Sequence, residues 1–288
     1  MAALLGSVYV GVTLGVDAPL AVNVVTVGTG AGLLLAERWW PRHPEWATGD
    51  PDLWQDVGHM VFGFALGSVG GAALADAAVP EPVWGLWPSG WPLAVQAVLG
   101  LVVAEFFQYW QHRLSHTVPA LWWIHVLHHS PTRMTFLKTT RIHALDVGSF
   151  TFLTVAPLLA LGAPLPVVLS VTAFGNFVSP LQHANVHMRT PRWLNHVFGT
   201  PAAHWLHHSI DKRQGHSNFG MNLMCWDHLF GTFMDPTSAP TPGLGIEPNP
   251  VPPGFLGQLL LPLQGLSALR WRRGARPYTA PEATGAGE

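Results

Sequence analysis

Histidine is the residue type whose number and spacing in this chain could do chemistry. The chain has 288 residues and 16 histidines, more than its 14 lysines and arginines together. Ten of the histidines fall into four short clusters, two with the spacing HxxxH and two with the spacing HxxHH. The clusters are His112 and His116; His125, His128 and His129; His183 and His187; and His204, His207 and His208.

The spacing within each cluster predicts a metal site. Residues three and four positions apart share one face of a helix, so each cluster would present its imidazoles to one side. Neutral imidazole binds iron, zinc, copper and nickel. A single HxxxH is usually structural or accidental, but ten packed rings without metal would leave many nitrogens without hydrogen-bond partners. Because ten imidazoles are too many for one ion, we expect a nitrogen-rich site for two.

Other polar residues could orient the metal ligands. Glu105 lies seven residues before His112, so it shares that helix face. A carboxylate in an apolar span is costly and usually functional, although an interfacial pairing with an arginine explains Glu105 equally well. Asp146 and Asp227 are similar candidates, and His143 could hydrogen-bond a metal ligand. We take Glu105, His143 and Asp227 as the candidates that act beside the metal.

The composition of the chain indicates which class of protein carries these residues. Hydrophobic residues make up 49% of the chain and charged residues 10%, whereas soluble domains carry about 25% charged residues. The high apolar content excludes a disordered chain. The single cysteine, Cys225, excludes a disulfide scaffold. A net charge of −2 leaves no basic field for nucleic acid. The composition predicts a membrane protein.

Four apolar regions approach or exceed the roughly 20 residues that a membrane-spanning helix needs. The last region is too long for one pass, and its Gly and Pro at 161–164 predict a helical hairpin. The first is broken near Asp17 and Pro19, so it could be one pass or two. It lacks the positively charged start of a signal peptide, which favours a retained anchor. The regions cover residues 4–36, 57–79, 91–110 and 147–178.

The lysines and arginines predict the orientation of these spans. Alternate threading, with the first region as one pass, puts all 14 cations on one face, which should be cytoplasmic. The histidine clusters fall on the same face. We therefore expect an all-α, integral-membrane bundle of about four spans, one a hairpin, in the inner membrane with a cytoplasmic helical cap. The expected parts are a membrane anchor (1–104), a histidine-rich catalytic region including the hairpin (105–235), and an irregular tail (236–288).

The four clusters and their flanks resemble the fatty acid hydroxylase/sterol desaturase superfamily of integral-membrane di-iron enzymes. The resemblance covers about residues 105–233. It rests on the runs HRLSH, HVLHHS, QHANVH and HWLHHS, and on the flanking runs Tyr109-Trp110, Pro119-x-Leu121-Trp122, SNFG at 217–220 and WDHLFGT at 226–232.

This resemblance implies a function and a cofactor. It implies two iron ions held by the ten clustered histidines, with O2 as co-substrate and a lipid-like substrate that is hydroxylated or desaturated. Zinc can occupy such sites in purified samples, since imidazole binds it well. The chain carries no cysteine set for an iron–sulfur cluster and no clear GxGxxG motif. We therefore expect a separate electron donor, a ferredoxin or flavoprotein reductase, docking on the cationic face.

Two alternatives remain open at this point. A desaturase would begin with the same hydrogen abstraction and differ in the fate of the radical. A membrane metal-binding or transport protein would place its ligands along the spans, or in loosely spaced histidine tracts. Here the ligand clusters lie beyond the span ends, which favours the enzyme.

Overall fold

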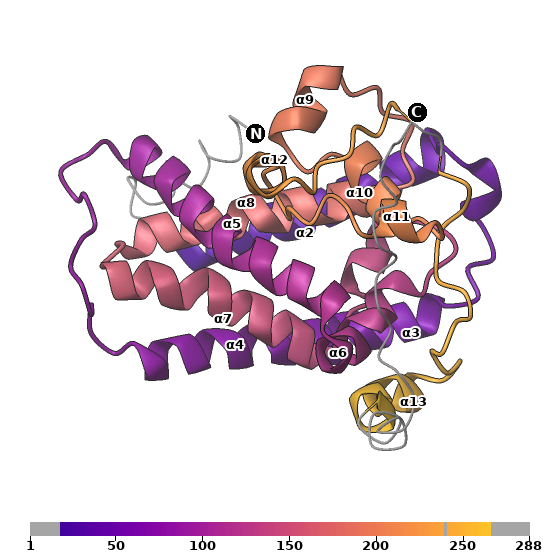
Figure 1. Cartoon of the computed structure of the whole chain (residues 1–288), viewed down its shortest axis with the longest axis horizontal. Coiled ribbons are helices and arrows are strands. Elements are labelled where there is room, and N and C mark those ends of the chain that lie inside the picture. The colour runs from indigo at the N-terminus through magenta and orange to yellow at the C-terminus, as the bar shows by residue number, and fades with distance from the viewer. Residues whose placement is uncertain (1–17, 239–240, 266–288) are drawn as a thin grey trace, which may run out of the picture.

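A computed structural model describes residues 18–238 and 241–265 of the chain. Within these residues the regular structure is helical, apart from three isolated β-bridges. The long helices run side by side and form a bundle, and the shorter helices gather mainly at one end of it (Figure 1). The expected all-α architecture is confirmed.

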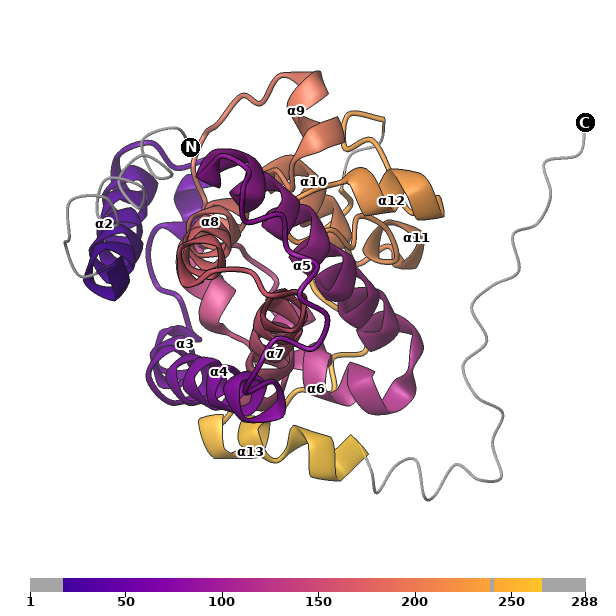
Figure 2. The ribbon, with the colours of Figure 1, turned by 90° about the vertical axis from the view of Figure 1, so that its left-hand side faces the viewer.

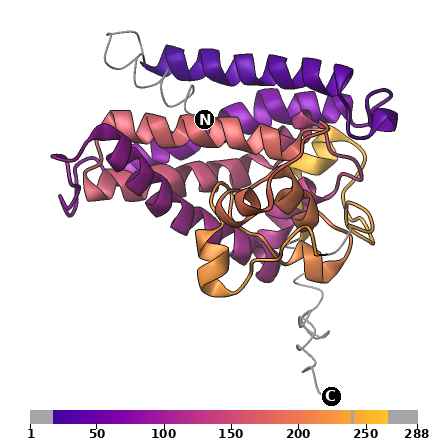
Figure 3. The same cartoon turned by 90° about the horizontal axis from the view of Figure 1, so that it is seen from above.

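Four helical stretches of the described residues are long and apolar enough to cross a membrane. The first is α3 (Leu53–Gly58), which continues through the π-helical segment η2 (His59–Phe64) into α4 (Ala65–Ala78). The others are α5 (Leu93–Thr117), α7 (Ala144–Leu161) and α8 (Leu165–His183). A further helix, α2 (Ala18–Trp39), packs against α8 and lies along one edge of the bundle (Figure 3). The first part of the expected region 4–36 lies outside the described residues.

The predicted hairpin is confirmed by α7 and α8. Gly162 ends α7 with a φ of 88°, a left-handed conformation that glycine adopts without strain. Pro164 then precedes the first turn of α8. At the same end, the loop after α4 meets this turn, because Val83 N donates to Ala160 O (3.1 Å) and Trp87 N donates to Leu161 O (2.9 Å). The two connections without lysine or arginine therefore lie together, opposite the histidine clusters.

The core of the bundle lies among α5, α7 and α8. Ala104, Leu158 and Val167 are fully buried there. Viewed along the bundle, α7 has α4, α5 and α8 as neighbours (Figure 2). Glycines allow the closest approach, because a Cβ atom at Gly71 would overlap the backbone of Gly148 on α7. Small residues at such contacts are typical of helix packing in lipid.

Short helices form a cap over the opposite end of the bundle. They come from two stretches of the chain, one between α5 and α7 and one after α8. They are α6 (Pro119–His129), η3 (Phe136–Thr140), α9 (Arg192–Val197), α10 (Pro201–His207), α11 (Lys212–Gly215) and α12 (Cys225–Phe230). The short helix η1 (Pro44–Trp46) follows α2 at the same end.

Buried ion pairs tie the cap to the start of α3. Lys138 of η3 is fully buried, and its Nζ lies 2.9 Å from Asp50 Oδ2 and also contacts Asp56. Arg141 lies 3.1 Å from the other oxygen of Asp56. Buried charges are tolerated when they are paired in this way. The network therefore fixes η3 against the end of the bundle.

The part of the tail that the structure describes is not wholly irregular. A short helix, α13 (Phe255–Leu259), packs against the start of the α3–η2–α4 stretch, where Gln258 Oε1 lies 2.9 Å from Nε2 of His59. Residues 266–288 of the predicted tail lie outside the described residues.

Candidate metal centre

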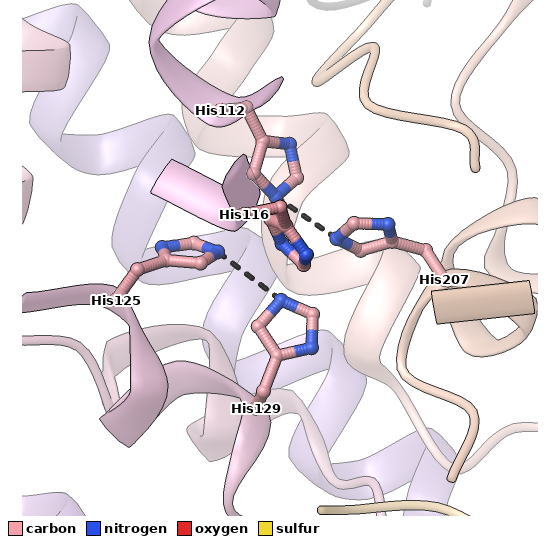
Figure 4. Close-up of side chains that lie close together, drawn as sticks. All are labelled: His112, His116, His125, His129 and His207. Atoms are coloured by element: carbon pink, nitrogen blue, oxygen red, sulfur yellow. Dashed lines mark hydrogen bonds between the residues drawn. The ribbon is translucent and has the colours of Figure 1, made fainter. Parts of the chain in front are cut away.

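Nine of the ten clustered histidines come together in two groups at the junction of bundle and cap. Within each group, one nitrogen from every ring lies within 4.8 Å of the others, and all nine residues are buried. The five-histidine group, drawn in Figure 4, consists of His112, His116, His125, His129 and His207. The four-histidine group consists of His128, His183, His204 and His208.

Helix periodicity explains part of this arrangement. His112 and His116 lie one turn apart on α5, and His125 and His129 lie one turn apart on α6, so each pair projects to one side. His128 is also on α6 but belongs to the four-histidine group. Thus α6 contributes to both groups, as does α10, which carries His204 and His207.

The Nε2 atoms converge within each group. In the five-histidine group, Nε2 of His207 lies 2.9 Å from Nε2 of His112, and the corresponding distance for His129 and His125 is 3.1 Å. In the four-histidine group, Nε2 of His204 lies 3.0 Å from that of His183 and 3.1 Å from that of His208. Lone pairs that face each other so closely need a proton or a cation between them.

Hydrogen bonds on the opposite ring nitrogen orient several of these lone pairs. Nδ1 of His112 donates to Phe219 O (2.8 Å), and Nδ1 of His207 donates to Ser217 O (2.7 Å). Nδ1 of His183 donates to the carbonyl of Ser179 (2.8 Å). A carbonyl oxygen can only accept, so the proton in each neutral ring is on Nδ1 and Nε2 is free to bind a metal.

His125 has a carboxylate partner instead. Its Nδ1 lies 2.7 Å from Asp146 Oδ2, and both side chains are buried. Pairs of this kind orient a metal-binding imidazole and raise its basicity. Asp146 follows the start of α7, so the hairpin directly positions a ring of the five-histidine group.

Burial keeps the cap histidines neutral. It lowers the pKa of His207 to about 3, and it lowers the pKa values of His129, His204 and His208 well below the usual value of 6.5. Neutral imidazole is the metal-binding form. His116 is also buried, and neither of its ring nitrogens has a hydrogen-bond partner. A buried ring without partners fits a metal ligand, so the residues present suit two metal ions.

His187 does not join either group. The expectation of one helix through 183–187 is wrong, because α8 ends at His183 and Ala184 is extended. The following residues bind the segment after α2 instead, where Asn185 O accepts from Arg42 N (3.1 Å) and His187 N donates to Trp40 O (2.9 Å). The side chain of His187 is therefore exposed and separated from the nine buried rings.

Glu105 and Asp227 both hold the loop at 217–222. Asp227 accepts hydrogen bonds from Phe219 N (2.8 Å) and Gly220 N (2.7 Å), and Glu105 accepts from Asn222 N (2.9 Å). The same loop supplies the carbonyl groups that bind His112 and His207. Neither carboxylate hydrogen-bonds a clustered histidine. Both bind the loop instead, and Glu105 also accepts from the side chain of Asn222 (2.9 Å).

His143 lies apart from both groups. It precedes α7, where its Nδ1 accepts a hydrogen bond from Leu145 N (3.2 Å) and its Nε2 lies 3.1 Å from Leu259 O. It therefore caps α7 and contacts the tail.

Asp146 contacts a clustered histidine directly, which the sequence did not indicate. The carbonyl groups of Ser179, Ser217 and Phe219 have no signal in the sequence, because every residue carries one.

A bundle of helices long and apolar enough to span a membrane, with two converging groups of buried imidazoles at one end, is the architecture of a membrane protein with a candidate site for two metal ions. The chain belongs to the fatty acid hydroxylase family, whose sequence profile, described as "Fatty acid hydroxylase", matches residues 97–232. It is thus a membrane hydroxylase that acts on a lipid-like substrate.

Individual relatives support this assignment. The chain is 40% identical to ornithine lipid hydroxylase OlsE of Rhizobium tropici over 249 residues, which cover 83% of this chain and 75% of the relative. It is 30% identical to the fatty acid hydroxylase vlmA of a Lecanicillium species, over 58% of this chain and 46% of the relative. Alkylglycerol monooxygenase of Homo sapiens is 29% identical, over 51% of this chain and 32% of the relative. No solved structure matches the chain.

Proposed function

We propose that this protein is a di-iron oxygenase that uses O2 and externally supplied electrons to hydroxylate a polar membrane lipid. The observation that carries the proposal is the convergence of nine buried imidazoles into two adjacent groups at the end of membrane-spanning helices. An iron pair bound there would supply the oxidising chemistry needed to break an unactivated C–H bond.

The proposed ligands are the nine histidines of the two groups. Their buried position excludes water, and the Nδ1 hydrogen bonds of His112, His183 and His207 hold the Nε2 lone pairs in place. In this proposal Asp146, Glu105 and Asp227 are positioning residues, the first through His125 and the others through the loop at 217–222. We assign His143 the capping of α7. The region 105–235 remains our proposed catalytic part.

The relatives favour hydroxylation over desaturation. The three described above are named as hydroxylases or monooxygenases, and the one with the highest identity among them acts on ornithine lipid. A site at the end of the spanning helices is at the depth where a polar lipid presents the junction of its chains and headgroup. We therefore propose an ornithine lipid or a similar polar lipid as substrate.

The electron donor is proposed to be a separate ferredoxin or flavoprotein reductase on the cytoplasmic side of the inner membrane. Four exposed cations lie on the cap, namely Arg189, Arg192, Lys212 and Arg213, and Arg192 is paired with Asp235 (2.7 Å). Such a surface favours an acidic partner, and its contribution to the association rate falls with ionic strength. Activity with the donor should therefore fall as salt rises and as these cations are neutralised. Activity insensitive to both changes would exclude docking at this surface.

Comparative lipid mass spectrometry tests the proposed reaction. The protein should be expressed in a host that makes ornithine lipid, beside the His128→Ala and His207→Ala variants. The expected product of the intact protein gains one oxygen atom and is absent with both variants. A loss of two hydrogens would show desaturation instead. Metal uptake into vesicles without any oxidised lipid would overturn the proposal in favour of transport.

Iron identity needs its own measurement. Protein purified after growth with iron should contain about two metal ions per chain by elemental analysis, if each histidine group binds one. O2 consumption should require lipid and should appear with iron but not with zinc. Full activity with zinc alone would refute the redox assignment.

A further inference from the structure

A pocket of about 320 Å³ lies between α5, α6 and α7, next to the five-histidine group. Its apolar walls include Trp110 and Leu114 of α5, Leu121 and Ile124 of α6, and Leu153 of α7. Leu114 is 41% exposed, so the pocket reaches the surface of the bundle. Both α5 and α7 are long and apolar enough to span a membrane, so in a membrane this opening would face lipid.

Three polar residues, Gln111, Asp146 and Ser149, also line the pocket, although its surface is almost entirely apolar. Gln111 Nε2 donates to Asp146 Oδ1 (3.0 Å) and to Ser149 Oγ (2.6 Å). Ser149 donates its own proton to Asp146 O (2.8 Å), so its oxygen is an acceptor here. Both partners of Gln111 are therefore acceptors. The NH2 group of Gln111, and not its carbonyl oxygen, must point toward them.

This orientation leaves Gln111 Oε1 without a partner. The residue is more than nine-tenths buried, and its carbonyl oxygen receives no hydrogen bond from the described residues. A buried acceptor without a donor is costly. The oxygen is covered by neighbouring side chains, so a pocket ligand that carries a hydroxyl or amide N–H would satisfy it after a small shift of these side chains.

The polar lining is one layer of side chains away from the metal ligands. Asp146 lines the pocket with one side and binds His125 Nδ1 with its Oδ2. Gln111 and Ser115, which also line the pocket, are the neighbours in sequence of His112 and His116. A molecule held there would lie beside the five-histidine group.

We propose that this pocket binds part of an acyl chain of the lipid substrate and that Gln111 Oε1 accepts a hydrogen bond from a hydroxyl or amide N–H of that lipid. Ligand pockets commonly measure about 300–1,000 Å³, so a pocket at the low end of that range suits a segment of one chain. The apolar walls match the chain, and the unpaired oxygen matches a donor near its polar end. This inference rests on the proposed function and adds a residue that selects the substrate.

The first test compares substrates that differ only in the donor. One pair is an ornithine lipid with a secondary amide and the same lipid with that amide N-methylated. A second pair is a chain with a hydroxyl group near its carbonyl and its deoxy analogue. We expect the intact enzyme to prefer the donor-bearing member of at least one pair by about fivefold or more in kcat/KM. In Gln111→Met, the preference should fall below about twofold.

A control separates selection from structural support. Ser149→Ala removes one hydrogen bond of Gln111 but leaves Oε1 in place, so it should affect both members of a pair equally and keep the preference. A merely structural role for Gln111 would lower both rates together in Gln111→Met and leave the ratio unchanged. An unchanged ratio, or no preference by the intact enzyme in either pair, would overturn the role of Gln111.

The second test needs no turnover. A lipid with a photoreactive diazirine in its acyl chain, added to the membrane-embedded protein, should form crosslinks to pocket residues such as Leu121 and Leu153. Leu153→Trp should remove these crosslinks by filling the pocket. Val98→Trp, at a 60% exposed position of α5 outside the pocket lining, should keep them. Crosslinks that form elsewhere, or that persist in Leu153→Trp, would overturn the pocket assignment.

The two tests also separate the inference from the proposed function. If lipid is hydroxylated but crosslinks avoid the pocket, the pocket assignment is wrong and the proposed function stands. If crosslinks occupy the pocket but no lipid gains oxygen, the proposed reaction is wrong, and with it the claim that the bound lipid is a substrate.

Discussion

Asp146 Oδ2 lies 2.7 Å from Nδ1 of His125, and both side chains are buried. The contact joins the first helix of the membrane hairpin to α6 of the cap. Asp146→Ala should lower metal affinity or activity by about 10–100-fold, as for other residues that orient metal ligands. Metal content after competition with a chelator measures this effect.

A matched control for this pair is present on the surface. His43 Nδ1 lies 2.9 Å from Glu45 Oε1, with Glu45 exposed and His43 partly exposed. Because solvent screens this pair and it touches no clustered histidine, Glu45→Ala should leave metal content unchanged. Equal effects of Asp146→Ala and Glu45→Ala would contradict the special role of Asp146.

Single substitutions should remove the metal ion from one histidine group at a time. His207→Ala removes a ring from the five-histidine group, and His128→Ala removes one from the four-histidine group. Each variant should bind about one metal ion fewer per chain and lose at least about 100-fold in activity, since an inner ligand should matter more than an outer one. Elemental analysis of the purified variants gives the stoichiometry.

His187→Ala is the control for these variants. His187 belongs to a similar sequence motif but is exposed and outside both groups. The variant should retain both ions and nearly full activity. Loss of an ion from this variant alone would show that the segment after α8 folds back onto the metal site.

Loss of the Asp227 carboxylate should loosen the loop at 217–222. Asp227→Ala leaves the amides of Phe219 and Gly220 without an acceptor, and each buried unpaired group costs about 1–3 kcal/mol. Because Phe219 O holds His112, metal affinity should fall together with thermal stability. Asp235→Ala also removes an acceptor of a backbone amide, that of Thr237, together with a surface ion pair to Arg192 (2.7 Å), but at a turn outside both histidine groups, and should leave metal affinity unchanged. A normal metal affinity in Asp227→Ala would exclude the positioning role.

The metal-free protein should lose stability as the pH falls. Burial lowers the pKa of His207 from 6.5 to about 3 and lowers those of His204 and His208 as well, so the unfolded chain binds more protons than the folded one. Stability is therefore fully present above about pH 6.5 and declines as the pH falls below it. Thermal unfolding of metal-free protein at pH 7.5, 6.5 and 5.5 should show a falling Tm. A constant Tm would mean that these rings take up protons in the folded state over the same pH range as in the unfolded chain.

Close packing of α4 on α7 should depend on Gly71. A side chain there would overlap the backbone of Gly148, whereas a side chain at Gly70 meets no atom within 4 Å. Gly71→Leu should therefore destabilise the protein in detergent by about 1–3 kcal/mol or more through overpacking. Gly70→Leu, one position along the same helix, should be tolerated. Equal melting temperatures for the two variants would argue against this helix contact.

The sequence by itself determined the membrane spans, the hairpin and most of the candidate metal ligands. Low charge and long apolar regions predict the spans, and the Gly and Pro at 161–164 predict the α7–α8 hairpin, because these signals are local. The HxxxH and HxxHH spacings also identify nine of the buried rings. Local spacing is sufficient here because helix geometry alone decides which residues of one helix share a face.

Only the tertiary structure decided how the rings are divided. His125 and His128 are one turn apart on α6, yet they belong to different groups. The ring of His125 contacts His112 and His116 of α5, whereas Nε2 of His128 lies 3.4 Å from Nε2 of His183 at the end of α8. His187 is excluded because the chain after His183 is extended and binds the segment after α2. The carbonyl groups that orient His112 and His207 come from a loop about 100 and 10 residues further along the chain. Such partners depend on how distant segments pack, which spacing along the sequence does not encode.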